Sequence, residues 1–105
     1  MPTFKLNISE TGTQSKGQPG YTYEVTTNRQ REHLFFFKRS DTDDRTWYFN
    51  VPEHNGRDIF TVSENIPVRY ITELAMAIII IRYGILDFDI QLTSKAKQQV
   101  KRQVK

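Results

Sequence analysis

Residues 66–84 read IPVRYITELAMAIIIIRYG, and this stretch decides the fold class of the 105-residue chain. Its apolar side chains recur every three or four residues, which predicts a helix from about residue 66 to residue 83. Asn65 can cap the first turn, and Gly84 is placed to stop the helix just after Arg82. The face expected to pack on a core holds Val68, Ile71, Leu74, Ala75, Ile78 and Ile79.

The second half of this stretch carries more apolar side chains than one buried face can use. Its β-branched run from Ile78 to Ile81 also leaves a strand as the competing interpretation. A helix that is apolar all round must be covered all round. The cover would come from the polar loop of residues 9–20, from the C-terminal segment, or from a protein partner such as a second copy of the chain. The predicted protein interface consists of Met76, Ile80, Ile81 and Tyr83.

Five strands are expected before the helix, because apolar residues there either alternate with polar ones or run together. Leu34 to Phe37 is continuously apolar, which predicts a central strand covered on both faces. Asn55-Gly56 is a strong hairpin signal and joins the last two of these strands. After the helix, the alternation from Leu86 to Leu92 predicts a sixth strand. The five earlier segments are residues 3–8, 21–27, 34–37, 46–51 and 58–62.

This order of elements predicts the α+β class. Strands joined by short turns favour an antiparallel meander of five to six strands, with one long helix packed across one face and a short basic C-terminal helix or tail. Five of the 15 Lys and Arg residues lie in residues 95–105, which hold no acid, so the net charge of +3 belongs to the tail. We therefore expect a single domain over residues 1–94 and a separate basic tail over residues 95–105.

The sequence offers no catalytic nucleophile, metal-ligand cluster or phosphate-binding loop. The chain has no cysteine, which excludes disulfide scaffolds, thiol catalysis and cysteine zinc sites. His33 and His54 have neither metal-ligand spacing nor a paired nucleophile. Asp41 begins a run that starts like a calcium loop, but Thr46 stands where that loop needs glycine and Pro52 where it needs glutamate. No enzyme, catalytic residue, metal, cofactor or small-molecule substrate is therefore expected.

Two carboxylates that alternate along one strand can hold a divalent cation, because alternate side chains share a face. Residues 86–90, Leu-Asp-Phe-Asp-Ile, form such a pattern, which resembles the metal-binding strand of nucleotidyltransferases and primases. Those families also need a third carboxylate and a glycine-rich or histidine-bearing partner strand, and neither follows Leu92. We interpret Asp87 and Asp89 as the solvated face of a strand.

Basic residues crowd the ends of the second, third and fourth expected strands, among aromatic residues of the same strands. Such a surface can stack the bases of single-stranded nucleic acid while its cations hold the phosphates. The alternative is that the aromatic side chains are buried and the arginines pair with neighbouring acids. The candidate nucleic-acid-binding residues are Arg29, Arg31, Lys38, Arg39, Trp47 and Tyr48, with Tyr21 and Tyr23 as further stacking residues and Lys97, Lys101 and Arg102 in the tail.

Two functions remain. The apolar helix favours a small non-enzymatic interaction module, such as an inhibitor, adaptor or assembly factor, that self-associates or binds a protein partner. The arginines, the aromatic residues and the basic tail favour a nucleic-acid-binding module as the alternative. The first residues, MPTFK, lack an apolar signal segment, and the longest apolar run, residues 74–81, is too short to span a bilayer. We therefore expect a cytoplasmic protein with no membrane partner.

Overall fold

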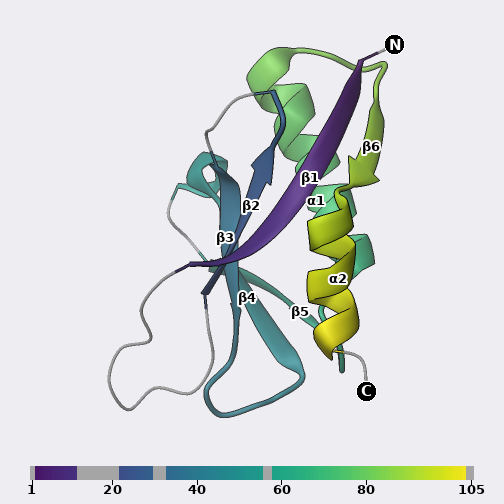
Figure 1. The fold of residues 1–105 in the computed structure, drawn as a ribbon. Helices are drawn as coiled ribbons and strands as arrows, with labels where there is room; N and C mark the ends of the chain where they lie inside the picture. The colour runs from purple at the N-terminus through teal and green to yellow at the C-terminus, as the bar shows by residue number, and fades with distance from the viewer. Residues whose placement is uncertain (1, 12–21, 30–32, 56–57, 104–105) are drawn as a thin grey trace.

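The computed structural model describes residues 2–11, 22–29, 33–55 and 58–103 (Figure 1). The helix expected at residues 66–83 and the five strands before it are confirmed, to within a few residues at their ends. The strands are β1 (Thr3–Thr11), β2 (Thr22–Thr27), β3 (His33–Arg39), β4 (Thr46–Asn50), β5 (Asp58–Val62) and β6 (Asp89–Leu92). The helices are the 3-10 helix η1 (Pro52–His54), α1 (Val68–Tyr83) and α2 (Ser94–Gln103).

The strands form one curled sheet in the order β5-β4-β3-β2-β1-β6 (Figure 1). The first five form the expected antiparallel meander, but β6 lies parallel to β1, with Phe4 opposite Ile90 and Leu6 opposite Leu92. The α+β class is confirmed, whereas the expectation of a purely antiparallel sheet is wrong. In a five-strand meander β1 and β5 run in the same direction, and α1, about 24 Å long, carries the chain back across the sheet. The next strand therefore enters beside β1 and runs the same way.

β3 places two consecutive side chains in the core. Its register with β2 shifts, so that Phe35 lies opposite Val25 while His33 lies opposite Thr26. Leu34 is the extra residue of this bulge, and both Leu34 and Phe35 are fully buried. The continuous apolar run thus reflects a bulge, and the expected cover on both faces of this strand is wrong.

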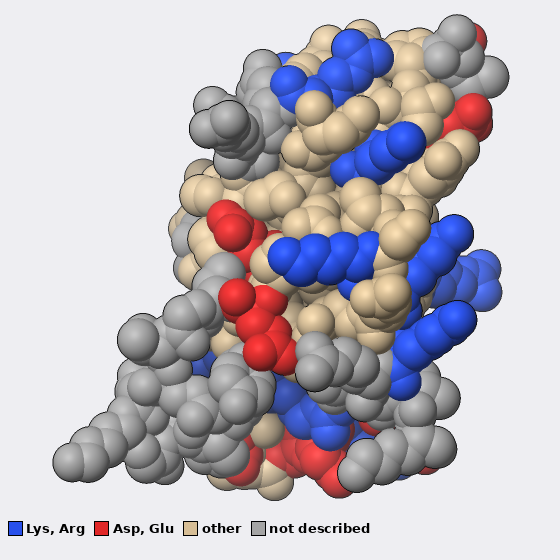
Figure 2. Space-filling view, viewed as in Figure 1, with Lys and Arg blue, Asp and Glu red and all other residues tan. Residues whose placement is uncertain are grey.

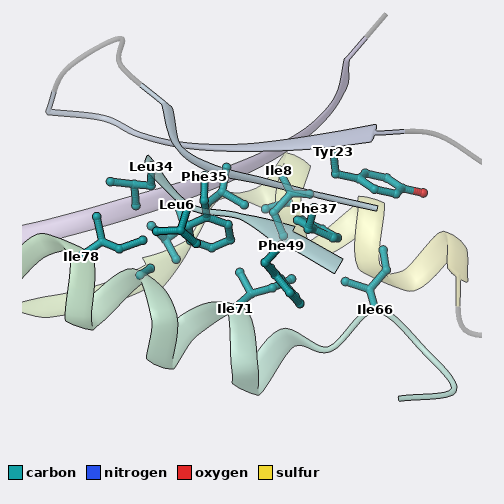
Figure 3. Packing of buried hydrophobic residues seen from close by; sticks show 14 of the residues in the cluster. Leu6, Ile8, Tyr23, Leu34, Phe35, Phe37, Phe49, Ile66, Ile71 and Ile78 are labelled. Atoms are coloured by element: carbon teal, nitrogen blue, oxygen red, sulfur yellow. The ribbon is translucent and has the colours of Figure 1, made fainter. Parts of the chain in front are cut away.

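The core lies between one face of the sheet and the helices, and Figure 3 shows α1 running along that face. Aromatic rings from three strands and α1 form a continuous row in it. The ring centroids of Tyr23 and Phe37 are 5.0 Å apart, those of Phe37 and Phe49 5.4 Å, and those of Phe49 and Tyr70 4.9 Å. Such offset and tilted contacts add to the gain from burying the rings.

The two ends of α1 are capped in different ways. Gly84 adopts a left-handed conformation, with φ of 66°, and its N–H donates to the carbonyl of Ile80 at 3.0 Å, so the expected stop is confirmed. At the start, Pro67 occupies the N-cap position and no side chain bonds the first turn, so the expected Asn65 cap is wrong. The proline ring fixes the backbone there instead.

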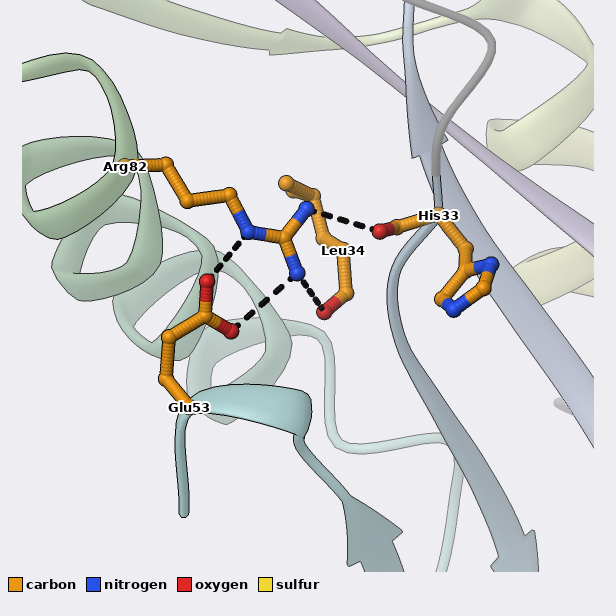
Figure 4. A network of polar contacts seen from close by, with 4 residues as sticks. All are labelled: His33, Leu34, Glu53 and Arg82. Atoms are coloured by element: carbon orange, nitrogen blue, oxygen red, sulfur yellow. Dashed lines mark hydrogen bonds and ion pairs between the residues drawn. The ribbon is translucent and has the colours of Figure 1, made fainter. Parts of the chain in front are cut away.

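Arg82, in the last turn of α1, ties the helix to the sheet (Figure 4). Its guanidinium donates to the carbonyl oxygens of His33 at 2.8 Å and Leu34 at 3.1 Å, and to both carboxylate oxygens of Glu53 in η1. The two carbonyls lie at the bulge, where regular ladder partners are lost. Hydrogen bonds from Arg82 are the main reason that the pKa of Glu53 lies below its usual value.

α2 packs on the domain. Ala96 is fully buried, Val100 packs against the core, and the Gln99 amide donates to the carboxylate of Glu10 in β1 at 2.9 Å. These three helix residues recur at helical spacing and form one face. Residues 96–100 of the expected tail thus contribute side chains to the packing of α2 on the domain.

Candidate interaction surfaces

The second half of α1 has an exposed apolar side. Met76, Ile80 and Ile81 retain 43%, 37% and 67% of their accessible surface. The first half of the helix is polar on its exposed side, where Arg69 donates to Glu73 at 3.2 Å. The helix is therefore divided along its length, and we call Met76, Ile80 and Ile81 the α1 patch.

Tyr83 differs from the other three residues of the expected interface. It is half-buried, and its ring centroid lies 5.5 Å from that of Phe4 in β1, so it packs inside the domain. Leu86, which was not among the expected residues, is 81% exposed shortly after the helix. The structure thus separates Tyr83 from the patch and adds an apolar side chain beyond the end of α1.

The sheet face opposite the helices carries cross-strand rows of aromatic and polar side chains, and we call it the open face. The register places Tyr48 between Lys38 and Phe60 in one row. Tyr48 and Phe60 also contact each other, with ring centroids 6.2 Å apart. A recess of about 530 Å³ opens on this face and is lined mainly by Thr22, Phe36, Lys38, Tyr48, Asn50 and Asp58.

The candidate nucleic-acid-binding residues of β3 and β4 are divided between the two faces of the sheet. Lys38 and Tyr48 lie opposite each other on the open face. Arg39 and Trp47, the next pair, lie on the helix side, with the guanidinium carbon 4.6 Å from the indole centroid. Trp47 is 1% exposed and its Nε1–H donates to the carbonyl of Ser63 at 3.0 Å, so it offers no face to a base.

Two further sheet candidates that the structure describes, Arg29 and Tyr23, lie away from Lys38 and Tyr48. Arg29 is exposed, and its guanidinium carbon lies 5.1 Å from the ring centroid of Phe4, beyond the end of β2. Tyr23 is buried in the aromatic row of the core. Arg31 and Tyr21 fall outside the described residues. Among the platform residues that the structure describes, Lys38 and Tyr48 are thus the one cation and the one aromatic ring that lie together on the open face.

The exposed side of α2 is basic. Lys95, Lys97 and Lys101 are exposed, and the sequence from residue 94 to residue 103 holds no acid. Figure 2 shows basic side chains along the side of the molecule where α2 lies. The side chain of Arg102 lies outside the described part of the chain. The basic segment thus presents its lysines from a helix that is anchored to the sheet.

The acidic candidates stand apart from one another. Asp87 precedes β6 whereas Asp89 is its first residue, and both are exposed. Asp43 organises the turn before β4, because its carboxylate accepts from the N–H of Arg45 at 2.9 Å and from the hydroxyl of Thr46 at 2.7 Å. These bonds hold the pKa of Asp43 below its usual value. Within the described ranges, no three His, Asp or Glu side chains come together to hold a metal.

Sequence reasoning did not predict that apolar side chains of β5 are exposed to solvent. Phe60 and Val62 are 62% and 56% exposed, although the strand was expected to be an ordinary return strand. The position of the strand in the chain could have indicated this exposure. A strand that is followed by a long helix has no hairpin partner on its far side. β5 is in fact an edge strand of the sheet.

Comparison of the chain with protein-family models, with curated proteins and with solved structures finds no match. α1 has 16 residues, and among the described helices none has the length and apolar character needed to cross a membrane. Three surfaces are therefore candidates on their geometry: the α1 patch, the open face with its β5 edge, and the basic side of α2.

Proposed function

We propose that the chain is a small non-enzymatic protein-interaction module and that the α1 patch is its contact surface. The proposal is carried by one observation, the exposure of Met76, Ile80 and Ile81 on a helix whose opposite side is already buried. Ile78 and Ile79 anchor that side in the core, so folding of the domain does not require the patch. Clustered exposed apolar side chains of this kind mark contact surfaces.

A second copy of the chain is the proposed partner. Met76 and Ile80 lie one helical turn apart, and the small Ala77 beside them lets another helix approach closely. The same helix side from two copies can pack about a twofold axis, so one patch serves both chains. The polar half of α1, with Arg69 and Glu73, then lies at the rim of the contact, where charged residues keep their water.

The test replaces Met76 and Ile80 with glutamate in one variant, Met76→Glu with Ile80→Glu. Their exposed fractions are 43% and 37%, so the fold is expected to survive, with an unchanged circular dichroism spectrum. Sedimentation velocity at equal concentration should give a smaller particle than wild type. The matched control, Arg69→Gln with Glu73→Gln, alters the polar half of the same helix and should leave the mass unchanged. Equal masses for the wild type and the glutamate variant would refute the proposal.

A second candidate function is the binding of single-stranded nucleic acid on the open face. It is favoured by the pairing of Lys38 with Tyr48 beside the half-buried Phe36, because rings stack on bases and a lysine holds a phosphate. Lys97 on α2 would add attraction to the same polyanion. Asp58 lines the same recess, and its negative charge ranks this function second.

Fluorescence anisotropy with a labelled oligothymidine tests this candidate. Tyr48→Ala should weaken binding by about 1–3 kcal/mol if the ring stacks on a base. Lys97→Gln with Lys101→Gln should weaken binding at low salt and lower its salt dependence. Binding that is lost with the lysines and unaffected by Tyr48→Ala would reduce the interaction to non-specific attraction and rule out the open face.

A further inference from the structure

β5 forms one edge of the sheet, and the direction of its backbone groups can be derived from one hydrogen bond. The N–H of Ser63, just after β5, donates inward to the carbonyl of Arg45 at 2.7 Å. Hydrogen-bonding direction alternates along an antiparallel strand, so Thr61 and Ile59 also bond toward β4. The N–H and C=O groups of Phe60 and Val62 therefore point away from the sheet.

The same two residues carry exposed apolar side chains on the open face. Phe60 is 62% exposed and Val62 is 56% exposed. An incoming strand would satisfy their backbone groups and cover their side chains at the same time. Only another extended backbone matches that combination of donors, acceptors and apolar surface.

The opposite edge of the sheet is constructed differently. β6 has four residues, and its exposed positions hold Asp89 and Gln91. Short length and charged or polar side chains are the features by which natural edges avoid pairing. β5 contains no Lys or Pro, and its single charged residue, Asp58, lies at its first position. The contrast identifies β5 as the edge suited to pairing.

Space is also available beside the edge. A recess of about 470 Å³ lies between the end of β5 and the start of α1. An added strand can therefore place side chains on the helix side of the sheet without displacing the helix. The recess is lined mainly by Thr61, Val62, Ile66, Pro67, Val68 and Tyr70.

We infer that β5 pairs antiparallel with β5 of a second copy about a twofold axis, with Phe60 opposite Phe60. This register uses all five residues of the strand and sets Asp58 opposite Val62 of the other copy. A shift of the twofold axis by one residue toward α1 would set Asp58 opposite Glu64, and like charges in opposite positions are unfavourable. The contact joins two sheets into one continuous sheet and is independent of the α1 patch.

A cysteine cross-link tests the register directly, because the chain has no cysteine of its own. In the proposed register the two Cα atoms at position 60 lie about 5.5 Å apart, which is within disulfide range. Phe60→Cys should therefore form a disulfide-linked dimer under mild oxidation. The matched control is Gln91→Cys, at an exposed position on the β6 edge, which should remain a single chain on a denaturing gel. Equal cross-linking of the two variants would exclude the pairing.

Light scattering then separates this contact from the one proposed for α1. Phe60→Lys places a charge at an exposed edge position and should leave the fold intact. With two independent twofold contacts, wild type forms assemblies larger than a dimer, whereas Phe60→Lys and the Met76→Glu, Ile80→Glu variant each stop at a dimer and their combination is a monomer. An unchanged mass for Phe60→Lys overturns the β5 contact and leaves the proposed function standing. An unchanged mass for the Met76→Glu, Ile80→Glu variant overturns the proposed function and leaves the β5 contact standing.

Discussion

Arg82 joins three segments that are distant in sequence, since one guanidinium from α1 bonds Glu53 in η1 and two carbonyls of β3. Arg82→Met keeps most of the apolar stem but removes every donor, leaving a partly buried carboxylate without its counter-charge. The free energy of unfolding from urea titration should fall by about 2–4 kcal/mol. Arg69→Met is the control, because its side chain is 92% exposed and such pairs contribute under about 1 kcal/mol. Equal losses in the two variants would show that the Arg82 contacts add nothing particular.

Glu53 links this contact to pH. Its folded-state pKa is lowered, mainly by hydrogen bonds from Arg82, so its contribution is complete above the unfolded-state pKa of about 4.5 and is lost as the pH falls through the folded-state value. Wild type should therefore lose more stability between pH 7 and strong acid than Glu53→Gln does, by urea titration at each pH. Asp43→Asn serves as a comparison, because the pKa of Asp43 is also lowered. This substitution should remove a separate part of the stability that wild type loses in acid. Identical losses in wild type and Glu53→Gln would mean that the folded-state pKa of Glu53 is not lowered.

At the scale of elements, α2 is the sharpest test of the packing. Ending the chain after Ser94 removes the buried Ala96 and the partly buried Val100, and it leaves Glu10 without its partner Gln99. A loss of about 2 kcal/mol or more is expected from the apolar area uncovered on the sheet, which lowers the melting temperature of a domain of this size by about 10 °C.

The control for this truncation is Lys97→Gln with Lys101→Gln, which removes charge from the exposed side of α2 and keeps its packed side. Its melting temperature should stay within a few degrees of wild type. A truncated protein with the melting temperature of wild type would support the expected division, in which residues 95–105 are a separate tail.

The local pattern of apolar and polar residues predicted α1 and the first five strands. It could do so because the hydrophobic periodicity of a core-facing element depends only on the residues of that element. It could not predict that β6 lies parallel to β1, since that pairing depends on where α1 returns the chain. The two-sided burial expected for β3 failed because a bulge, which has no local signature, turns Leu34 into the core.

For the candidate site, too, some features follow from the local sequence and others depend on how the whole chain folds. Trp47 and Tyr48 are neighbours in one strand, so their side chains must face opposite sides of the sheet, and this alternation is enough to show that the expected platform could not hold both. Which of the two is buried depends on which face the helices cover. The α1 patch was predictable because a surplus of apolar residues on one helix is a property of that helix.

For the whole molecule, salt distinguishes the contacts proposed here. The α1 patch and the β5 edge are apolar contacts, so assembly should persist or strengthen between about 50 and 500 mM salt. Nucleic acid held by Lys38, Lys97 and Lys101 should instead be released, because each phosphate contact on a single strand contributes about 0.7 to the log-log salt slope. Three contacts predict roughly a hundredfold loss of affinity over that tenfold range of salt.

Both quantities can be measured in one sedimentation experiment with a labelled oligonucleotide. The protein boundary should keep its sedimentation coefficient as the label leaves it. An assembly that dissociates in step with the label would mean that ionic contacts, and not Met76, Ile80 and Phe60, hold the copies together. The salt dependence therefore shows whether the exposed apolar residues or the exposed lysines hold the assembly together.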